Sequence, residues 1–342
     1  MDPKDQFGLS IHDQMRKNRW RTLYFFMLFP IIIIGLTYIG ILLTATFNNS
    51  DITLHPIDIA NEMMSTFGFW VLIGVFLYSL ISYFLGSKMI LAFAGAKPIE
   101  KKDNPQLYRV VENMAIAAGM PKTPDIYIIN DDSLNAFATG THPNNSKVAI
   151  SKGLLNKLDK SELEAVMAHE IGHIINRDIR VMLLAVTLVG AIQMVGEILI
   201  RTRGGGSSSN KGGNPLILIG ILFLTIGVLI GTLTRFALSR EREYLADATG
   251  AHLSSNPRAL STALQKIALD SRIEILDKKA SMAGLCIADP TATGHLKHRR
   301  SLSNREAMEK LEKQNKGIFA FWKNIWSTHP PIMNRIGRLN QY

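Results

Sequence analysis

Four long apolar stretches interrupt the polar sequence of this chain, at residues 23–45, 63–85, 181–200 and 216–234. A helix rises about 1.5 Å per residue, so each stretch spans roughly 28 Å or more and can cross the core of a bilayer. The alternative is a buried helix of a soluble core. That alternative is stronger for the last two stretches, because Gln193 and Glu197 interrupt the third.

The charges beside these stretches predict how the chain is oriented. The first stretch is longer than the apolar segment of a signal peptide, and no small-x-small cleavage site follows it, so we interpret it as a retained anchor. Lys and Arg lie before the first stretch, after the second, before the third and after the fourth, whereas the connection 48–62 has none. Because basic loops stay in the cytoplasm, both termini and both large polar regions are expected there. The connection 201–214, rich in Gly and Ser, carries Arg201, Arg203 and Lys211 and opposes this assignment.

The net charge of +10 does not indicate a nucleic-acid partner. The basic residues gather beside the apolar stretches, where they meet the anionic headgroups of a lipid bilayer. The sequence has no basic stripe with interleaved aromatic residues, so we expect no nucleic acid. The single cysteine, Cys286, cannot form an intramolecular disulfide, which fits a reducing compartment.

The two polar regions have different patterns. The first is predicted to contain a helix over 104–120 and short strands over 124–129, 135–140 and 147–155. A further helix begins at Asp159, which forms a capping box with Glu162. The second region is predicted to be helical to about Ser254, with a new helix after the N-cap Asn256. No element is predicted for 278–316.

The capped helix carries the motif HEIGH, with His169 and His173 four residues apart. This spacing puts both imidazoles on one face, where they can bind one tetrahedral Zn²⁺ ion. Glu170 points away from the ligand axis and can reach a water on the metal, whose pKa zinc lowers toward ~7. The motif also arises by chance, so it does not decide the function alone.

The third ligand must come from elsewhere. Asp178 is a poor candidate, because it lies five residues beyond His173 and off the ligand face. Glu243 and Asp247 lie four apart on a predicted helix, so Glu243 can bind the metal while Asp247 fixes the tautomer of a ligand histidine. A solvated acidic face, with Arg240 and Arg242 as partners, is the alternative.

The apolar hairpin favours the metal-binding interpretation. If one helix continues from the motif through 165–184 into the third stretch, His173 lies about 10 Å before Arg180. A helix after the fourth stretch puts Glu243 about 12 Å beyond Arg235. His173 and Glu243 are therefore expected at the same height, side by side.

HEIGH, the apolar hairpin, SREREYLAD and STHPP together resemble the HtpX family of membrane zinc metalloproteases, relatives of the CAAX prenyl proteases. The resemblance covers nearly the whole chain from residue 88 onward. It implies one zinc ion per chain held by His169, His173 and Glu243, with Glu170 as general base.

The resemblance also implies roles for residues beyond the metal ligands. Asp247 would support a ligand, and His329 in STHPP would hydrogen-bond the oxyanion; a turn without chemistry is the alternative for His329. A cleft-lining strand is implied whose backbone pairs with substrate, and it consists of Asn135, Ala136, Phe137 and Ala138.

The expected fold is an α-helical membrane protein with about four transmembrane helices and a cytoplasmic α+β zincin-like catalytic domain, mostly helical with a small β-sheet. The parts are an arm over 1–22, a transmembrane hairpin over 23–87, a first catalytic part over 88–180, a second hairpin over 181–234 with the loop 201–214, and a second catalytic part over 235–342.

The leading hypothesis is an endopeptidase of the bacterial cytoplasmic membrane that cuts misfolded or damaged membrane proteins or unfolded polypeptides. A CAAX-type prenyl protease needs an enclosed intramembrane chamber, for which four segments are few. A scaffold with structural zinc would usually have four protein ligands. The oligomeric state does not follow from the sequence.

Overall fold

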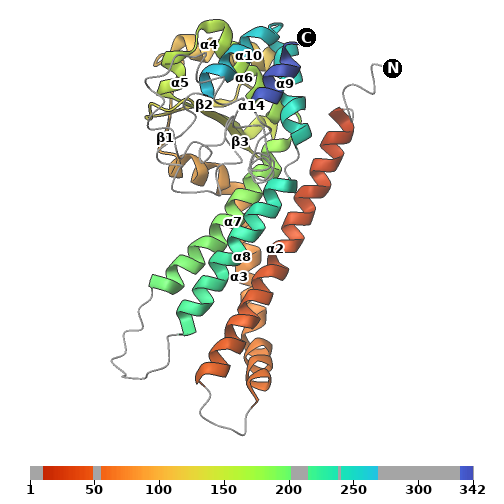
Figure 1. Cartoon of the computed structure of the whole chain (residues 1–342), viewed down its shortest axis with the longest axis vertical. Coiled ribbons are helices and arrows are strands. Elements are labelled where there is room, and N and C mark those ends of the chain that lie inside the picture. Colours follow the sequence, from red (N-terminus) through yellow and green to blue (C-terminus); the bar gives the residue numbers. More distant parts are fainter. Residues whose placement is uncertain (1–10, 49–54, 202–214, 238–239, 269–331, 342) are drawn as a thin grey trace. The chain divides into compact units, whose positions relative to one another are not determined.

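The computed structural model describes residues 11–48, 55–201, 215–237, 240–268 and 332–341 (Figure 1). The chain divides into two compact units. We call Arg21–Phe84 with Leu184–Leu233 the helical unit. The α+β unit consists of Met1–Trp20, Leu85–Leu183 and Thr234–Tyr342.

Four helices contribute to the helical unit: α2 (Ile11–Asn48), α3 (Pro56–Phe93), α7 (Asp178–Arg201) and α8 (Pro215–Ala237). Within the described residues, α2, α3 and α7 each carry a segment long and apolar enough to cross a membrane. Large apolar side chains such as Phe69, Trp70 and Phe84 are exposed, as expected of a surface that faces lipid. Three of the four expected spans are therefore found by length and composition. The fourth falls on α8, whose described apolar segment is shorter, so the count of four stays a prediction.

The helices of this unit contact one another through small residues and through side-chain hydrogen bonds. A Cβ added at Gly196 on α7 would lie 3.0 Å from the backbone oxygen of Gly220 on α8, so the two backbones approach closely. Tyr78 on α3 donates its hydroxyl hydrogen to the backbone oxygen of Thr187 on α7 at 3.0 Å. These contacts hold α3, α7 and α8 together.

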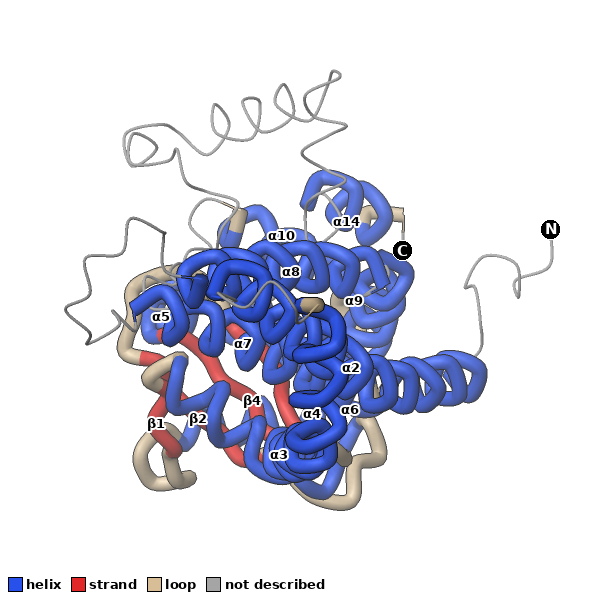
Figure 2. The backbone as a smooth tube through the Cα atoms, turned by 90° about the horizontal axis from the view of Figure 1, so that it is seen from below, coloured by secondary structure: helices blue, strands red, loops and turns tan. Residues whose placement is uncertain are grey.

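The α+β unit is built on a four-stranded mixed sheet with the order β1-β2-β4-β3 (Figure 2). Its strands are β1 (Ala96–Pro98), β2 (Asp125–Ile129), β3 (Ala136–Gly140) and β4 (Ser146–Ser151). β2 and β4 are parallel and the other pairs are antiparallel, which leaves β3 at an edge. The three predicted strands are confirmed with one correction: the strand over 147–155 ends at Ser151, whose side chain accepts the amide of Leu154 and caps helix α5 (Lys152–Lys157).

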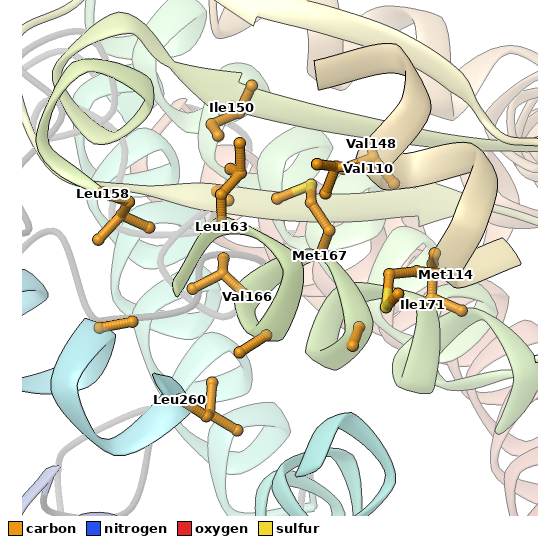
Figure 3. Packing of buried hydrophobic residues seen from close by; sticks show 14 of the residues in the cluster. Val110, Met114, Val148, Ile150, Leu158, Leu163, Val166, Met167, Ile171 and Leu260 are labelled. Carbon is orange, nitrogen blue, oxygen red and sulfur yellow. The ribbon is translucent and has the colours of Figure 1, made fainter. Parts of the chain in front are cut away.

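Helix α6 (Lys160–Ile175) lies at the centre of the core of this unit. The expected capping box is present: Asp159 accepts the amide of Glu162, and Glu162 accepts that of Asp159. Met167 meets Val148 of the sheet and Val110 of α4 (Pro105–Ala117), as Figure 3 shows. Helix α10 (Pro257–Ile267), which carries Leu260, covers the other side of α6.

The expectation of one continuous helix through 165–184 is wrong. Helix α6 ends at Ile175 and α7 begins at Asp178. Between them Arg177 has φ 59, a left-handed backbone conformation that no helix can continue through. The height argued from an unbroken helical rise therefore does not apply.

Helix α9 (Arg240–Ser254) lies against α6 at very close range. A Cβ added at Gly250 would lie 2.9 Å from the backbone nitrogen and 3.0 Å from the Cα of His169. A Cβ at Gly172 would lie 3.3 Å from the Cβ of Thr249. Any larger side chain at Gly250 would have to push backbone rather than a flexible side chain, so glycine is required there.

We expect Gly250→Ala to lower the free energy of unfolding by about 1–3 kcal/mol, because the added methyl forces α9 away from α6. The measurement is thermal unfolding of the full chain in detergent. Gly337→Ala is the matched control, since a Cβ at that helical glycine has no neighbour within 4 Å. The control should be as stable as the wild type or slightly more stable. Equal melting temperatures for both variants would show that the α6–α9 contact is not tight.

Candidate metal centre

Helix α6 presents the three residues of the motif in a dry environment. His169, Glu170 and His173 are all buried, and the two imidazole rings lie edge to face with centroids 4.8 Å apart. Spacing of four residues on a capped helix produces this pairing. The motif therefore stands on a rigid element packed on both sides.

Helix α9 brings Glu243 to the two histidines. Its Oε1 lies 3.6 Å from Nε2 of His173, and its Oε2 lies 3.9 Å from Nε2 of His169. One ligand atom from each residue lies within 4.8 Å of the others, an arrangement that could hold a metal ion. Glu243 and Asp247 are 4% and 3% exposed, which rules out the alternative of a solvated acidic face.

Each histidine is oriented by its own buried carboxylate. Asp247 lies 3.0 Å from Nδ1 of His169, and Asp178 lies 3.2 Å from Nδ1 of His173. A carboxylate on Nδ1 favours a proton there and leaves the lone pair of Nε2 for a metal. Both Nε2 atoms face Glu243 as a result.

The sequence makes Asp178 a poor candidate ligand, and in the described residues it is not part of the cluster that could hold a metal ion. Its role as the partner of His173 was missed. The break at Arg177 turns the chain back, so that the first residue of α7 reaches the imidazole. The available signal is a carboxylate three residues before the apolar stretch that begins at residue 181.

Two buried arginines hold these carboxylates. Arg335 on helix α14 (Ile332–Leu339) donates from Nε to Oδ2 of Asp247 at 2.8 Å and from Nη2 to Oδ1 at 2.6 Å. Nη1 of Arg242 lies 3.7 Å from Oδ1 of Asp178. No local sequence pattern indicates Arg335, because its contacts join residues far apart in the chain.

The charge of this cluster fits a divalent metal. Four carboxylates and two guanidinium groups are buried together, and they belong to Glu170, Asp178, Glu243, Asp247, Arg242 and Arg335. With the carboxylates ionised and the imidazoles neutral, the sum is −4 + 2 = −2, which one dication would balance. Two imidazoles and one carboxylate also form a donor set that zinc takes in catalytic sites.

The pKa of Glu170 lies in the range useful for proton transfer. Burial raises it to about 7, although His173 and a backbone hydrogen bond from Ala138 lower it. A carboxylate with a pKa near neutrality can both accept and return a proton. Among the ligands, burial and the nearby Arg335 lower the pKa of His169, whereas Asp178 and Glu243 outweigh burial and raise that of His173 to about 9.

The expected strand lies at an edge of the sheet, where Ala136, Phe137 and Ala138 belong to β3 and Asn135 directly precedes it. Asn135, Phe137 and Ala138 are buried, and the Asn135 side chain accepts the backbone N–H of Ala136 at 2.9 Å. Phe137 is paired with Ala149 of β4, and its side chain is part of the core. His329, residues 202–214 of the Gly/Ser loop and the stretch 278–316 lie outside the described residues.

We expect Asp178→Asn to weaken metal binding by about 10–100-fold, because an amide provides no charge to hold the Nδ1 proton of His173 or to pair with Arg242. The measurement is a competition titration with a chromophoric chelator on the full chain. Asp125→Asn is the control, since that carboxylate is on the exposed end of β2 and pairs only with Lys122 in the interactions seen there. Unchanged affinity in Asp178→Asn would contradict the orienting role.

Comparison with known proteins identifies the family of the chain. Residues 101–342 match the model of peptidase family M48. The chain is 35% identical to the "Protease HtpX homolog" of Bacteroides fragilis, over 98% of this chain and 99% of that protein. The proteins of the same name from Tropheryma whipplei and Dictyoglomus turgidum are 37% and 39% identical, over 77% and 75% of this chain and 81% and 76% of theirs.

A solved structure is also similar. The crystal structure of S. mikatae Ste24p is 19% identical, with a TM-score of 0.42; the match covers 90% of this chain and 62% of that one. The extent of the family match and the identity to the curated relatives settle the assignment. The chain belongs to peptidase family M48 and, within it, to the HtpX family of membrane metalloproteases.

Proposed function

We propose that this protein is a membrane-anchored zinc endopeptidase in which His169, His173 and Glu243 hold one zinc ion and Glu170 is the general base. One observation carries the proposal. Three ligand atoms lie within 4.8 Å of one another, and each ligand histidine has a buried carboxylate on its other nitrogen. Such an arrangement is preorganised for a metal and leaves a coordination position for water.

Zinc, when bound, would supply Lewis acidity that activates water and polarises the scissile carbonyl. The chain's own groups then move the proton. The Glu170 carboxylate accepts it from the attacking water and delivers it to the nitrogen of the leaving amine. Its pKa of about 7 suits both transfers, and the backbone of Ala138 holds the carboxylate in place.

Strand β3 offers a place for the substrate backbone. The amide of Ser151 donates to the oxygen of Asn135, and bonding alternates along the antiparallel pair, so Phe137 and Thr139 also bond to β4. The backbone groups of Ala136 and Ala138 therefore point away from β4. There the N–H of Ala136 donates to Asn135 and that of Ala138 to Glu170, which leaves their carbonyl oxygens as the groups that a substrate would meet. In the proposal an extended substrate pairs with these groups, next to Glu170.

The proposed setting is the bacterial cytoplasmic membrane, with the metal centre on the cytoplasmic side. The basic residues beside the apolar stretches support this orientation. Misfolded or damaged membrane proteins and unfolded polypeptides are the proposed substrates. An edge strand pairs with the backbone of a substrate whatever its sequence, provided that the substrate is unfolded.

Two other functions are less well supported. A scaffold with structural zinc would need a fourth protein ligand, and in the part of the chain that the structure describes the cluster has three. A prenyl protease would need an enclosed chamber for its lipidated substrate. Among the described residues, no feature of the metal centre favours a lipidated substrate.

We expect Glu170→Gln to keep its zinc and to lose about 10²–10⁴-fold in kcat, because the amide cannot accept the proton of water. Casein or an unfolded membrane protein serves as the substrate, and zinc is quantified on the same sample. His169→Ala is the companion variant, and it should lose both zinc and activity. Wild-type cleavage by Glu170→Gln would overturn the mechanism.

We expect Ala138→Pro to lower kcat/KM about tenfold with zinc content unchanged, because proline removes the N–H that holds the Glu170 carboxylate without touching a bond to β4. Ala138→Ser is the control, since it keeps the N–H and adds only a hydroxyl. If both variants cleave like the wild type, the Ala138 N–H does not support the general base.

A further inference from the structure

Arg335 is in an unexpected place for a cation. Its side chain is fully buried, its Nη2 lies 3.4 Å from Nε2 of His169, and its Nη1 lies 3.6 Å from Oε2 of Glu243. These are two of the atoms that face the proposed metal ion. A guanidinium group so close to these atoms repels a dication. Arg335 is therefore expected to make another contribution that offsets this repulsion.

Its hydrogen bonds show what it can do. Nε and Nη2 bind the two oxygens of Asp247 at 2.8 and 2.6 Å, a two-point contact that fixes the plane of the carboxylate. Asp247 in turn lies 3.0 Å from Nδ1 of His169. One guanidinium group thus reaches His169 through Asp247 and faces Glu243 directly.

Helix α14, which carries Arg335, has other attachments. Ile336 and Leu339 are buried in the core of the α+β unit. Arg338 lies over the ring of Tyr244 at 3.8 Å, and Asn340 accepts the hydroxyl hydrogen of Ser261 at 3.0 Å. Docking of the helix therefore does not depend on a buried charge at Arg335, which is costly to desolvate.

We propose that Arg335 is a positioning residue of the metal centre: it fixes Asp247 and Glu243 so that both His169 and Glu243 aim at one metal ion. The proposal rests on the metal centre proposed above. In this proposal α14 supports a metal site whose ligands come from α6 and α9.

The competing role for Arg335 is to compensate charge. The two roles predict opposite changes in metal affinity. Removing a cation from a site that binds a dication tightens binding if charge is its only contribution. Removing a positioning group weakens binding, because Asp247 and Glu243 lose their fixed orientation. The sign of the change therefore decides between them.

The test is zinc affinity of full-length Arg335→Met in detergent, measured by competition with a chromophoric chelator. Methionine keeps an unbranched side chain without charge or donors. We expect zinc binding to weaken about 10–100-fold. We also expect the visible absorption of the cobalt-substituted protein to change in position or intensity, which reports the ligand geometry without activity.

Arg338→Met is the matched control. It lies three residues away on the same helix and also loses a guanidinium contact, but that contact is to Tyr244 and not to the ligands. Its zinc affinity should stay within about threefold of the wild type, since surface contacts of this kind contribute little. An equal loss in both variants would overturn the proposal and assign the effect to docking of α14.

Arg335→Lys keeps the test informative if Arg335→Met does not fold. Lysine retains the charge but cannot make the two-point contact, so we expect weaker zinc binding here too. Unchanged or tighter binding in either Arg335 variant would overturn the proposal. A wild-type protein without zinc would instead overturn the metal centre itself, so the two failures are distinguishable.

Discussion

The close approach of α6 and α9 is the constraint on which the rest of the site depends. A Cβ at Gly250 would lie 2.9 Å from the backbone nitrogen of His169, so no side chain fits between the two helices at this point. Both histidines come from α6, while Glu243 and Asp247 come from α9. The geometry of the ligand cluster is therefore set by backbone contact, which is stiffer than contact through long side chains.

The buried charges around this contact depend on one another. An ionised group taken out of water must find partners, and replacing such networks with apolar residues often stabilises a protein. Asp178 and Asp247 nevertheless remain buried, each between a histidine and an arginine. Their value lies in orientation rather than in stability: each fixes the direction of an imidazole, and a dication completes the balance of charge.

Local patterns in the sequence were sufficient to predict part of this site. The capping box at Asp159 and the spacing of His169 and His173 involve neighbours on one helix, and the structure has both as expected. The four-residue spacing of Glu243 and Asp247 makes Glu243 a candidate ligand, whereas the height estimate that favoured it assumes an unbroken helix and is wrong. No local pattern reveals that Arg177 adopts φ 59, because the conformation is imposed by tertiary packing. Arg335 was missed for the same reason, since its partners lie far away in sequence.

The long separation of His173 and Glu243 in the sequence has a consequence for the entropy of forming the site. Bringing Glu243 to His173 closes a loop, and an unstructured loop of that length would cost conformational entropy that rises with its logarithm. Here the intervening chain forms α7 and α8, whose backbones approach closely at Gly196 and Gly220. Most of the conformational entropy is therefore lost when this hairpin forms, and little is left to lose when the site forms. Asp178 then joins the two: it is the first residue of α7 and the hydrogen-bond partner of His173. A change in how α7 begins is therefore transmitted to a ligand through a single carboxylate.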